Sequence, residues 1–200
     1  MAMRTKPIPE SAPETPRRAA DRIRETAFDL FYREGIRAVG VEEIVSQAGV
    51  TKPSLYRAFE SKDELIAAYL RDYDQRFRER FEAPGAEHPR DPKAHLLAYL
   101  DRLATRACHD DYRGCGLTNA VIEYPEREHP AHQVAVQSKQ NLRERLREMC
   151  REMGARDPDE LADGLLLLLE GSYVSGQAFG EGGPARMLGV MARRLIEASI

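Results

Sequence analysis

Apolar residues along this chain recur at intervals of three and four, and this spacing limits the fold more than any other feature. It first appears in the stretch RRAADRIRETAFDLFYREGIRAVG, residues 17–40, where one helical face would carry Ala20, Ile23, Ala27, Leu30 and Phe31. Gly35 follows as a plausible C-terminal cap. We find no stretch with the period-two alternation of a strand and no internal repeat. The pattern predicts an all-α protein.

Start and stop signals divide the chain into further helices. Thr51 is placed to accept the backbone N–H of Ser54, and Pro53 then falls in the first turn, where a helix tolerates it. Ser61 and Glu64 form a capping box. Helices are therefore expected at about residues 41–48, 51–59, 61–81, 93–109, 117–124, 131–153, 159–179 and 185–198.

Composition excludes several classes of protein. The 200 residues are 42% apolar with a net charge of −3, so any nucleic-acid surface has to be local. Three dispersed cysteines indicate no disulfide framework. The N-terminus lacks the apolar segment of a secretory signal, and the longest apolar run, Leu165–Leu169, is too short to span a bilayer. We expect a cytoplasmic protein without a membrane partner, preceded by a disordered, proline-rich tail at residues 1–16.

Residues 17–62 contain the pattern of a helix-turn-helix. Three helices would pack together, with the sequence AGVT as the turn before the third. In that third helix Leu55, Ala58 and Phe59 share one side and are expected to face inward. The opposite side would then present to DNA the residues Lys52, Pro53, Ser54, Tyr56 and Arg57. The segment is thus interpreted as a helix that enters the major groove.

Each outward residue has an expected role. Lys52 and Ser54 would read base edges, and Pro53 would contact a thymine methyl group. The phosphate contacts are expected from Thr51, Tyr56, Arg57 and Lys62. Arg17 and Arg18 would contact the DNA backbone or the minor groove. Alternatives stay open for Tyr56, as a half-buried core residue, for Arg57, as the partner of Glu60, and for the two N-terminal arginines, as an ordinary charged helix start.

The stretch GIRAVGVEEIVSQAGVTKPSLYRAFESKDELIAAYL resembles the DNA-binding head of the TetR family of regulators. The resemblance covers residues 17–70. It implies a homodimer, an all-helical regulatory domain with a small-molecule pocket, and repression that the ligand relieves. The expected division is a helix-turn-helix domain at 17–62 and a ligand-binding and dimerisation domain at 63–200, which begins with a connecting helix at 63–81.

Two helices of the second domain are candidates for dimerisation. The helix at about 159–179 is apolar nearly all round, so both a core and a partner subunit are needed to bury it. The helix at about 185–198 offers a second apolar stripe. Two such helices from each chain would form a four-helix interface, which would place two recognition helices on a pseudo-palindromic operator.

A ligand pocket is expected around Asn119 and Glu123, two polar residues one turn apart on an otherwise apolar helix. Local capping or pairing of these two side chains is the competing interpretation. Further lining candidates, each of which also fits plain core, are Phe77, Tyr99, Leu103, Tyr124, Met149, Met153, Tyr173 and Gln177. The ligand would tilt the connecting helix and so change the distance between the two DNA-binding heads.

Other functions have weaker support in the sequence. Cys108 and Cys115 are too far apart for an ordinary zinc pair, and buried inert thiols are the default interpretation. We expect no metal and no cofactor. The chain lacks nucleophile-elbow, P-loop, dinucleotide and zincin motifs, so an enzyme is not expected. A helical adaptor without DNA binding and a transcriptional activator remain as alternatives.

Overall fold

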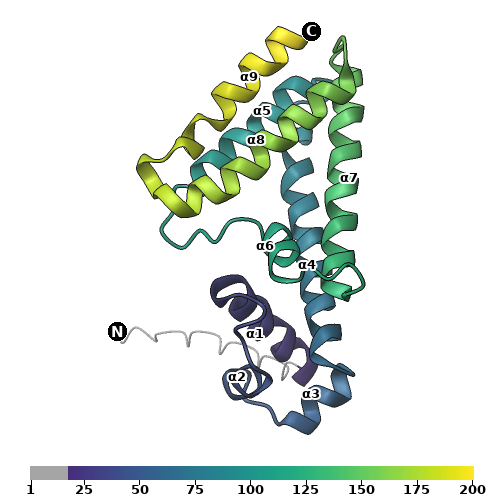
Figure 1. The fold of residues 1–200 in the computed structure, drawn as a ribbon, viewed down its shortest axis with the longest axis vertical. Coiled ribbons are helices and arrows are strands. Elements are labelled where there is room, and N and C mark those ends of the chain that lie inside the picture. The colour runs from purple at the N-terminus through teal and green to yellow at the C-terminus, as the bar shows by residue number, and fades with distance from the viewer. Residues whose placement is uncertain (1–17) are drawn as a thin grey trace, which may run out of the picture.

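The computed structural model of the protein describes residues 18–200 and shows an elongated helical molecule (Figure 1). Within this range the regular elements are nine α-helices and three short 3-10 helices, without a strand. The prediction of an all-α fold is confirmed. The tail expected at residues 1–16, and Arg17, lie outside the described residues.

The first three helices form a small head at one end of the molecule (Figure 1). They are α1 (Ala19–Glu34), α2 (Val41–Gln47) and α3 (Lys52–Ala58). Ile23, Phe31, Ile44 and Leu55 are buried between them. The expectation that Ala58 faces inward is wrong, because α3 ends there and Ala58 is exposed. Phe59, the next residue, adopts an extended backbone with φ of −140°. Its phenyl ring, and not Ala58, is buried in the core of the head.

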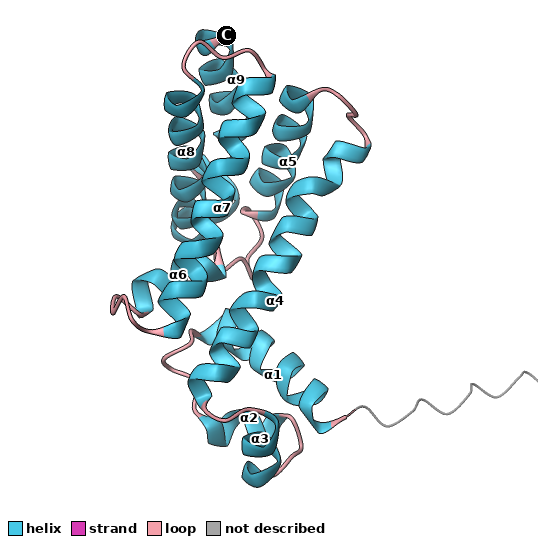
Figure 2. Cartoon of the chain, turned by 90° about the vertical axis from the view of Figure 1, so that its right-hand side faces the viewer, coloured by secondary structure: helices cyan, strands magenta, loops and turns pink. Residues whose placement is uncertain are grey.

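Helix α4 (Lys62–Glu82) joins this head to the rest of the chain and runs along much of the molecule (Figure 2). Its start is capped as predicted, because the Ser61 hydroxyl accepts the backbone N–H of Glu64 at 3.1 Å. The Glu64 carboxylate in turn accepts the N–H of Glu60 at 2.5 Å. Two orphan N–H groups are thereby satisfied. The N-terminal half of α4 contributes Ile66 to the buried core and the C-terminal half contributes Phe81.

The remaining helices form the body of the protein. Their bounds are α5 (Pro92–Arg106), α6 (Gly116–Glu123), α7 (Pro130–Glu152), α8 (Pro158–Phe179) and α9 (Leu188–Ser199), with the 3-10 helices η1 (Ala83–Ala86), η2 (Gly180–Gly182) and η3 (Pro184–Met187). Asp91 and Asp157 cap α5 and α8 by accepting backbone N–H groups. Helix α9 begins three residues later than expected, since the chain at η3 is wound more tightly.

Helices α8 and α9 pack side by side at the end of the body far from the head (Figure 2). Leu165 and Leu169 of α8 are buried within the chain, whereas Leu167 between them is 74% exposed. Helix α8 thus has apolar side chains both in the core and on the surface. Across the described residues, we find no helix with the length and hydropathy needed to span a membrane.

Candidate nucleic-acid interface and body contacts

The start of α3 is fixed by its own side chains. The Thr51 hydroxyl accepts the backbone N–H of Ser54 at 3.4 Å and lies 3.0 Å from the Ser54 hydroxyl oxygen. Gly49, with φ of +62°, makes the turn from α2 into α3. Leu55 is fully buried and anchors the helix on the head. The cap and this anchor hold the opposite face of α3 in a fixed orientation.

That opposite face is open to solvent. Lys52, Pro53 and Arg57 are exposed, and the side chain of Tyr56 is 50% exposed. Tyr56 therefore is not a core residue in this structure. Ser54 is half-buried, because its hydroxyl faces the cap at Thr51. Four of the five predicted outward residues thus share one accessible surface, as a groove-binding helix requires.

Lys52 is paired within the head. Its ammonium group forms an ion pair with the carboxylate of Glu42 on α2, and the hydrogen bond to this carboxylate raises the pKa of Lys52 above its ordinary value. The two side chains are 49% and 71% exposed, so the pair lies at the surface. Glu42 thus holds the ammonium group in place and also reduces the positive potential of the surface that would meet DNA.

Lys62 is less accessible than the sequence predicted. Its ammonium group donates to the backbone carbonyl of Ile36 at 3.1 Å, and burial lowers the pKa of the lysine. This bond ties the start of α4 to the loop between α1 and α2. Arg18 is exposed at the N-terminal end of α1. The predicted phosphate contact of Lys62 would require its side chain to leave Ile36.

Glu123 contacts the head. Its carboxylate accepts the backbone N–H of Arg37 at 2.8 Å. The Arg37 guanidinium lies 4.8 Å from the centre of the Tyr124 ring and donates to Glu126 at 3.1 Å. The polar residues expected at a pocket thus join α6 to the loop after α1. This contact is not the local pairing of the competing interpretation, because Arg37 lies 86 residues before Glu123 in the sequence.

A second contact between head and body involves the loop from α5 to α6. The Tyr32 hydroxyl on α1 accepts the backbone N–H of Arg113 at 3.2 Å and donates to the Gly114 carbonyl at 3.3 Å. The Asn119 side-chain amide donates to the Arg113 carbonyl at 2.8 Å and steadies the same loop. Asn119 and Glu123 therefore both support the junction between body and head.

The other predicted pocket residues fall into separate groups. Tyr99, Leu103, Met149 and Tyr173 are buried in the body, and Tyr99 and Tyr173 are close to each other. Met153 is partly buried at the end of α7, and Gln177 is exposed. The structure does not bring all predicted residues around one cavity.

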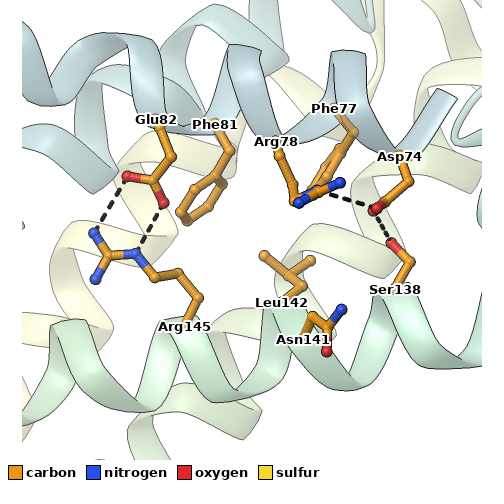
Figure 3. Close-up of a pocket in the computed structure, with 9 residues that line it drawn as sticks. All are labelled: Asp74, Phe77, Arg78, Phe81, Glu82, Ser138, Asn141, Leu142 and Arg145. Atoms are coloured by element: carbon orange, nitrogen blue, oxygen red, sulfur yellow. Dashed lines mark hydrogen bonds and ion pairs between the residues drawn. The ribbon is translucent and has the colours of Figure 1, made fainter. Parts of the chain in front are cut away.

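A groove of about 170 Å³ runs between α4 and α7 (Figure 3). Its lining residues are Asp74, Phe77, Arg78, Phe81, Glu82, Ser138, Asn141, Leu142 and Arg145. Polar side chains at each end are already paired: Asp74 accepts from Ser138 at 2.5 Å, and Arg145 donates to Glu82 at 2.8 Å. The groove therefore offers a ligand mainly apolar contact.

Lys139 is a half-buried charged residue that the sequence interpretation did not single out. Its ammonium group lies 2.6 Å from the Glu170 carboxylate and 3.5 Å from the Cys115 sulfur. The Thr118 hydroxyl donates to the same carboxylate at 2.8 Å. The sequence contained a sign of this position, because Lys139 lies four residues after Ala135 and so shares the apolar face of α7. Its full pairing indicates a structural role.

The head, with a capped helix whose outer face is open, defines a helix-turn-helix transcriptional regulator. Residues 23–69 match the family model described as bacterial regulatory proteins, tetR family. A TetR-type transcriptional regulator from Streptomyces avermitilis is 33% identical in sequence, with 90% of this chain and 97% of that chain covered and a TM-score of 0.78. The chain belongs to the TetR family of DNA-binding transcriptional regulators, which are not enzymes.

Two of the curated relatives match this chain over shorter segments. The transcriptional repressor KstR2 of Mycolicibacterium smegmatis is 35% identical over 65 residues, which are 31% of this chain and 32% of that protein. The transcriptional activator FasR of the same organism is 48% identical over 44 residues, which are 22% of this chain and 20% of that protein. The chain therefore spans a third or less of the length of these relatives.

Proposed function

We propose that the protein is a homodimeric repressor that leaves a pseudo-palindromic operator when a small molecule binds its body. The observation that carries the DNA-binding part is the open outer face of α3, with Lys52, Pro53, Tyr56 and Arg57 exposed together. In this proposal Lys52, Pro53 and Ser54 meet base edges, and Thr51, Tyr56, Arg57, Lys62, Arg17 and Arg18 contact phosphates.

The same proposal assigns a separate function to each of the two domains. Residues 17–62 bind DNA, and residues 63–200 bind the effector and the second subunit. Helix α4 serves both parts, because its first turn is tied to the head through Lys62 while Phe77 and Phe81 belong to the core of the body.

The second subunit is proposed to cover α8 and α9. Large apolar side chains that are exposed on and next to these helices are Leu167, Val174, Phe179, Met187, Val190 and Met191. A groove of about 290 Å³ runs between Leu167, Gly171 and Met191. An apolar surface of this extent is typical of an interface between subunits. Two copies packed through this face would form the four-helix interface expected from the sequence.

Effector binding would act on the head through the contacts already described. The body holds α1 at Tyr32 and the following loop at Arg37, and α4 continues from the head into the body. A ligand that shifts the loop before α6 or the end of α4 changes these contacts. The two heads would then no longer match the spacing of the two half-sites, so that DNA affinity falls.

The experiment is capture of fragmented genomic DNA on the purified protein, followed by sequencing. Lys52→Ala combined with Tyr56→Ala is the test variant, and Arg102→Ala on α5, which removes a surface ion pair with Glu87, is the control. We expect one pseudo-palindromic motif for the wild type and the control, and loss of enrichment for the double variant. Diffuse capture that does not respond to the double variant would reject the proposal and favour an adaptor.

An activator is the second candidate, because one relative with a similar head is named as an activator. The two directions of regulation differ in the position of the operator and not in the structure of the head. Transcription from a captured promoter with purified polymerase distinguishes them. A repressor lowers the transcript level, and an activator raises it.

A further inference from the structure

Three tyrosine hydroxyl groups lie buried in the body without a hydrogen-bond partner among residues 18–200. They belong to Tyr99, Tyr112 and Tyr173, whose side chains are 2%, 6% and 2% exposed. Buried polar groups in proteins are nearly always hydrogen-bonded, because an unsatisfied donor loses its bonds to water and gains none in return. Three such groups in one region therefore need a specific explanation.

The three hydroxyl groups come from different parts of the chain. Tyr99 belongs to α5, Tyr112 to the loop before α6, and Tyr173 to α8. The Tyr173 hydroxyl adjoins that of Tyr99 closely enough to affect its pKa, but the two oxygens do not meet the geometry of a hydrogen bond. Gly176 brings α8 onto the loop, since a Cβ atom there would lie 2.9 Å from the Tyr112 ring. The hydroxyl groups thus occupy one region between α5, α8 and the loop.

Arg106 adds a positive charge to this region. It follows Tyr99 by two helical turns on α5, so both side chains lie on the same face. Burial raises the pKa of Tyr99 to about 12 and also raises the pKa of Tyr112. The positive charge of Arg106 lowers the pKa of both tyrosines and so opposes this rise. Arg106 is half-buried, and its guanidinium group forms no hydrogen bond or ion pair with another described residue. Lys139, by contrast, is neutralised by Glu170.

We propose that Arg106 and the hydroxyl groups of Tyr99, Tyr112 and Tyr173 bind the carboxylate of a small, largely apolar acid. This inference rests on the proposed function, because it names the chemical class of the effector. A guanidinium group and hydroxyl donors match the oxygens of a carboxylate. One cation with three neutral groups balances a single negative charge. The apolar part of the ligand has neighbours in the Phe81 ring, whose centre lies 4.8 Å from that of Tyr99, and in Phe77.

The position of this carboxylate site also connects it to the head. Tyr112 directly precedes Arg113, whose backbone N–H donates to the Tyr32 hydroxyl on α1 at 3.2 Å. A carboxylate that draws Tyr112 toward itself moves the same loop. The loop would then shift α1 of the head relative to the body.

The experiment measures binding of octanoate to the full-length protein by calorimetry, with the uncharged octanamide as the matched probe. We expect octanoate to bind and octanamide to bind at least about tenfold more weakly. Arg106→Gln and Tyr173→Phe should each weaken octanoate binding by about tenfold or more. Arg102→Gln on the same helix should leave the affinity for octanoate unchanged. Tyr173→Phe should keep or raise the melting temperature of the ligand-free protein, because it removes an unsatisfied buried group.

Failure of the inference and failure of the proposed function can be told apart by a parallel DNA-binding assay. The inference is overturned if octanoate does not bind, if octanamide binds as well, or if Arg106→Gln binds octanoate like the wild type. A fall in melting temperature on Tyr173→Phe, with octanoate binding kept, assigns that hydroxyl a structural role and also overturns it. Specific octanoate binding by a protein that does not bind DNA supports the carboxylate site and rejects the repressor.

Discussion

At the scale of single residues, the pairing of Lys52 with Glu42 sets the charge of the DNA-binding surface. A carboxylate on the surface that would meet DNA repels the phosphates and competes with the base edges for the lysine. The Glu42→Gln variant should therefore bind duplex DNA roughly two- to fivefold more tightly at moderate salt, since exposed pairs of this kind are weak. Its affinity should also fall more steeply with salt concentration, because the DNA-binding surface gains one unneutralised positive charge and displaces more counterions from the DNA.

The control for Glu42→Gln is Glu43→Gln, which removes the same charge from the neighbouring position of α2. Glu43 accepts a hydrogen bond from Gln47 at 3.5 Å and has no ion pair with Lys52. Fluorescence anisotropy over a salt series gives both affinities and slopes. Equal effects of the two variants would mean that net charge alone matters and that the Lys52 pair does not.

At the scale of elements, the capped start of α4 stabilises the connection between head and body. Ser61→Ala removes the acceptor for the Glu64 N–H, and we expect the free energy of unfolding to fall by about 1 kcal/mol. Ser46→Ala, at an exposed position of α2, should change it by less than about 0.5 kcal/mol. Denaturant titration followed by circular dichroism measures both values. Equal stability of Ser61→Ala and wild type would show that the cap contributes nothing.

The elements also show what could be predicted from the sequence. Caps at Thr51 and Ser61 depend on residues three positions apart, so the sequence sufficed to place these helix starts. The inward side of α3 was predicted except for Ala58, because the helix ends earlier than its periodicity suggests. Glu123 was predicted as a ligand-pocket residue, and its contact with Arg37 was not predicted, because the two residues lie 86 positions apart and no local pattern encodes such a pair.

In the body, too, contacts between residues far apart in the sequence could not be predicted from the sequence. Tyr99 and Tyr173 were predicted as candidate pocket residues that also fit plain core. Their convergence with Tyr112 and Arg106 depends on how α8 packs on the loop at Gly176, which is a property of the tertiary structure. The sequence therefore named part of the candidate site, and the geometry was needed to identify its unsatisfied donors.

At the scale of the whole molecule, the function depends on two heads held at a fixed distance. Leu167 is 74% exposed at the centre of the α8 surface, so a second subunit would bury it. Leu167→Glu would place an unpaired charge in this interface, and we expect the dissociation constant of the dimer to rise by at least about tenfold. Sedimentation velocity over a concentration series measures this change. The affinity for the operator should fall as the dimer dissociates, since each monomer reaches only one half-site.

Ile122→Glu is the matched control for the dimer prediction. Ile122 is also a large apolar residue, 69% exposed, but it lies on α6, away from the proposed interface. The control should remain dimeric and bind the operator like the wild type, because a charge at a solvated position costs little. If Leu167→Glu stays dimeric while Ile122→Glu dissociates, the subunits meet through α6. The spacing of the heads would then be set by the junction with the body, and the proposed route from effector to operator would have to run through that interface.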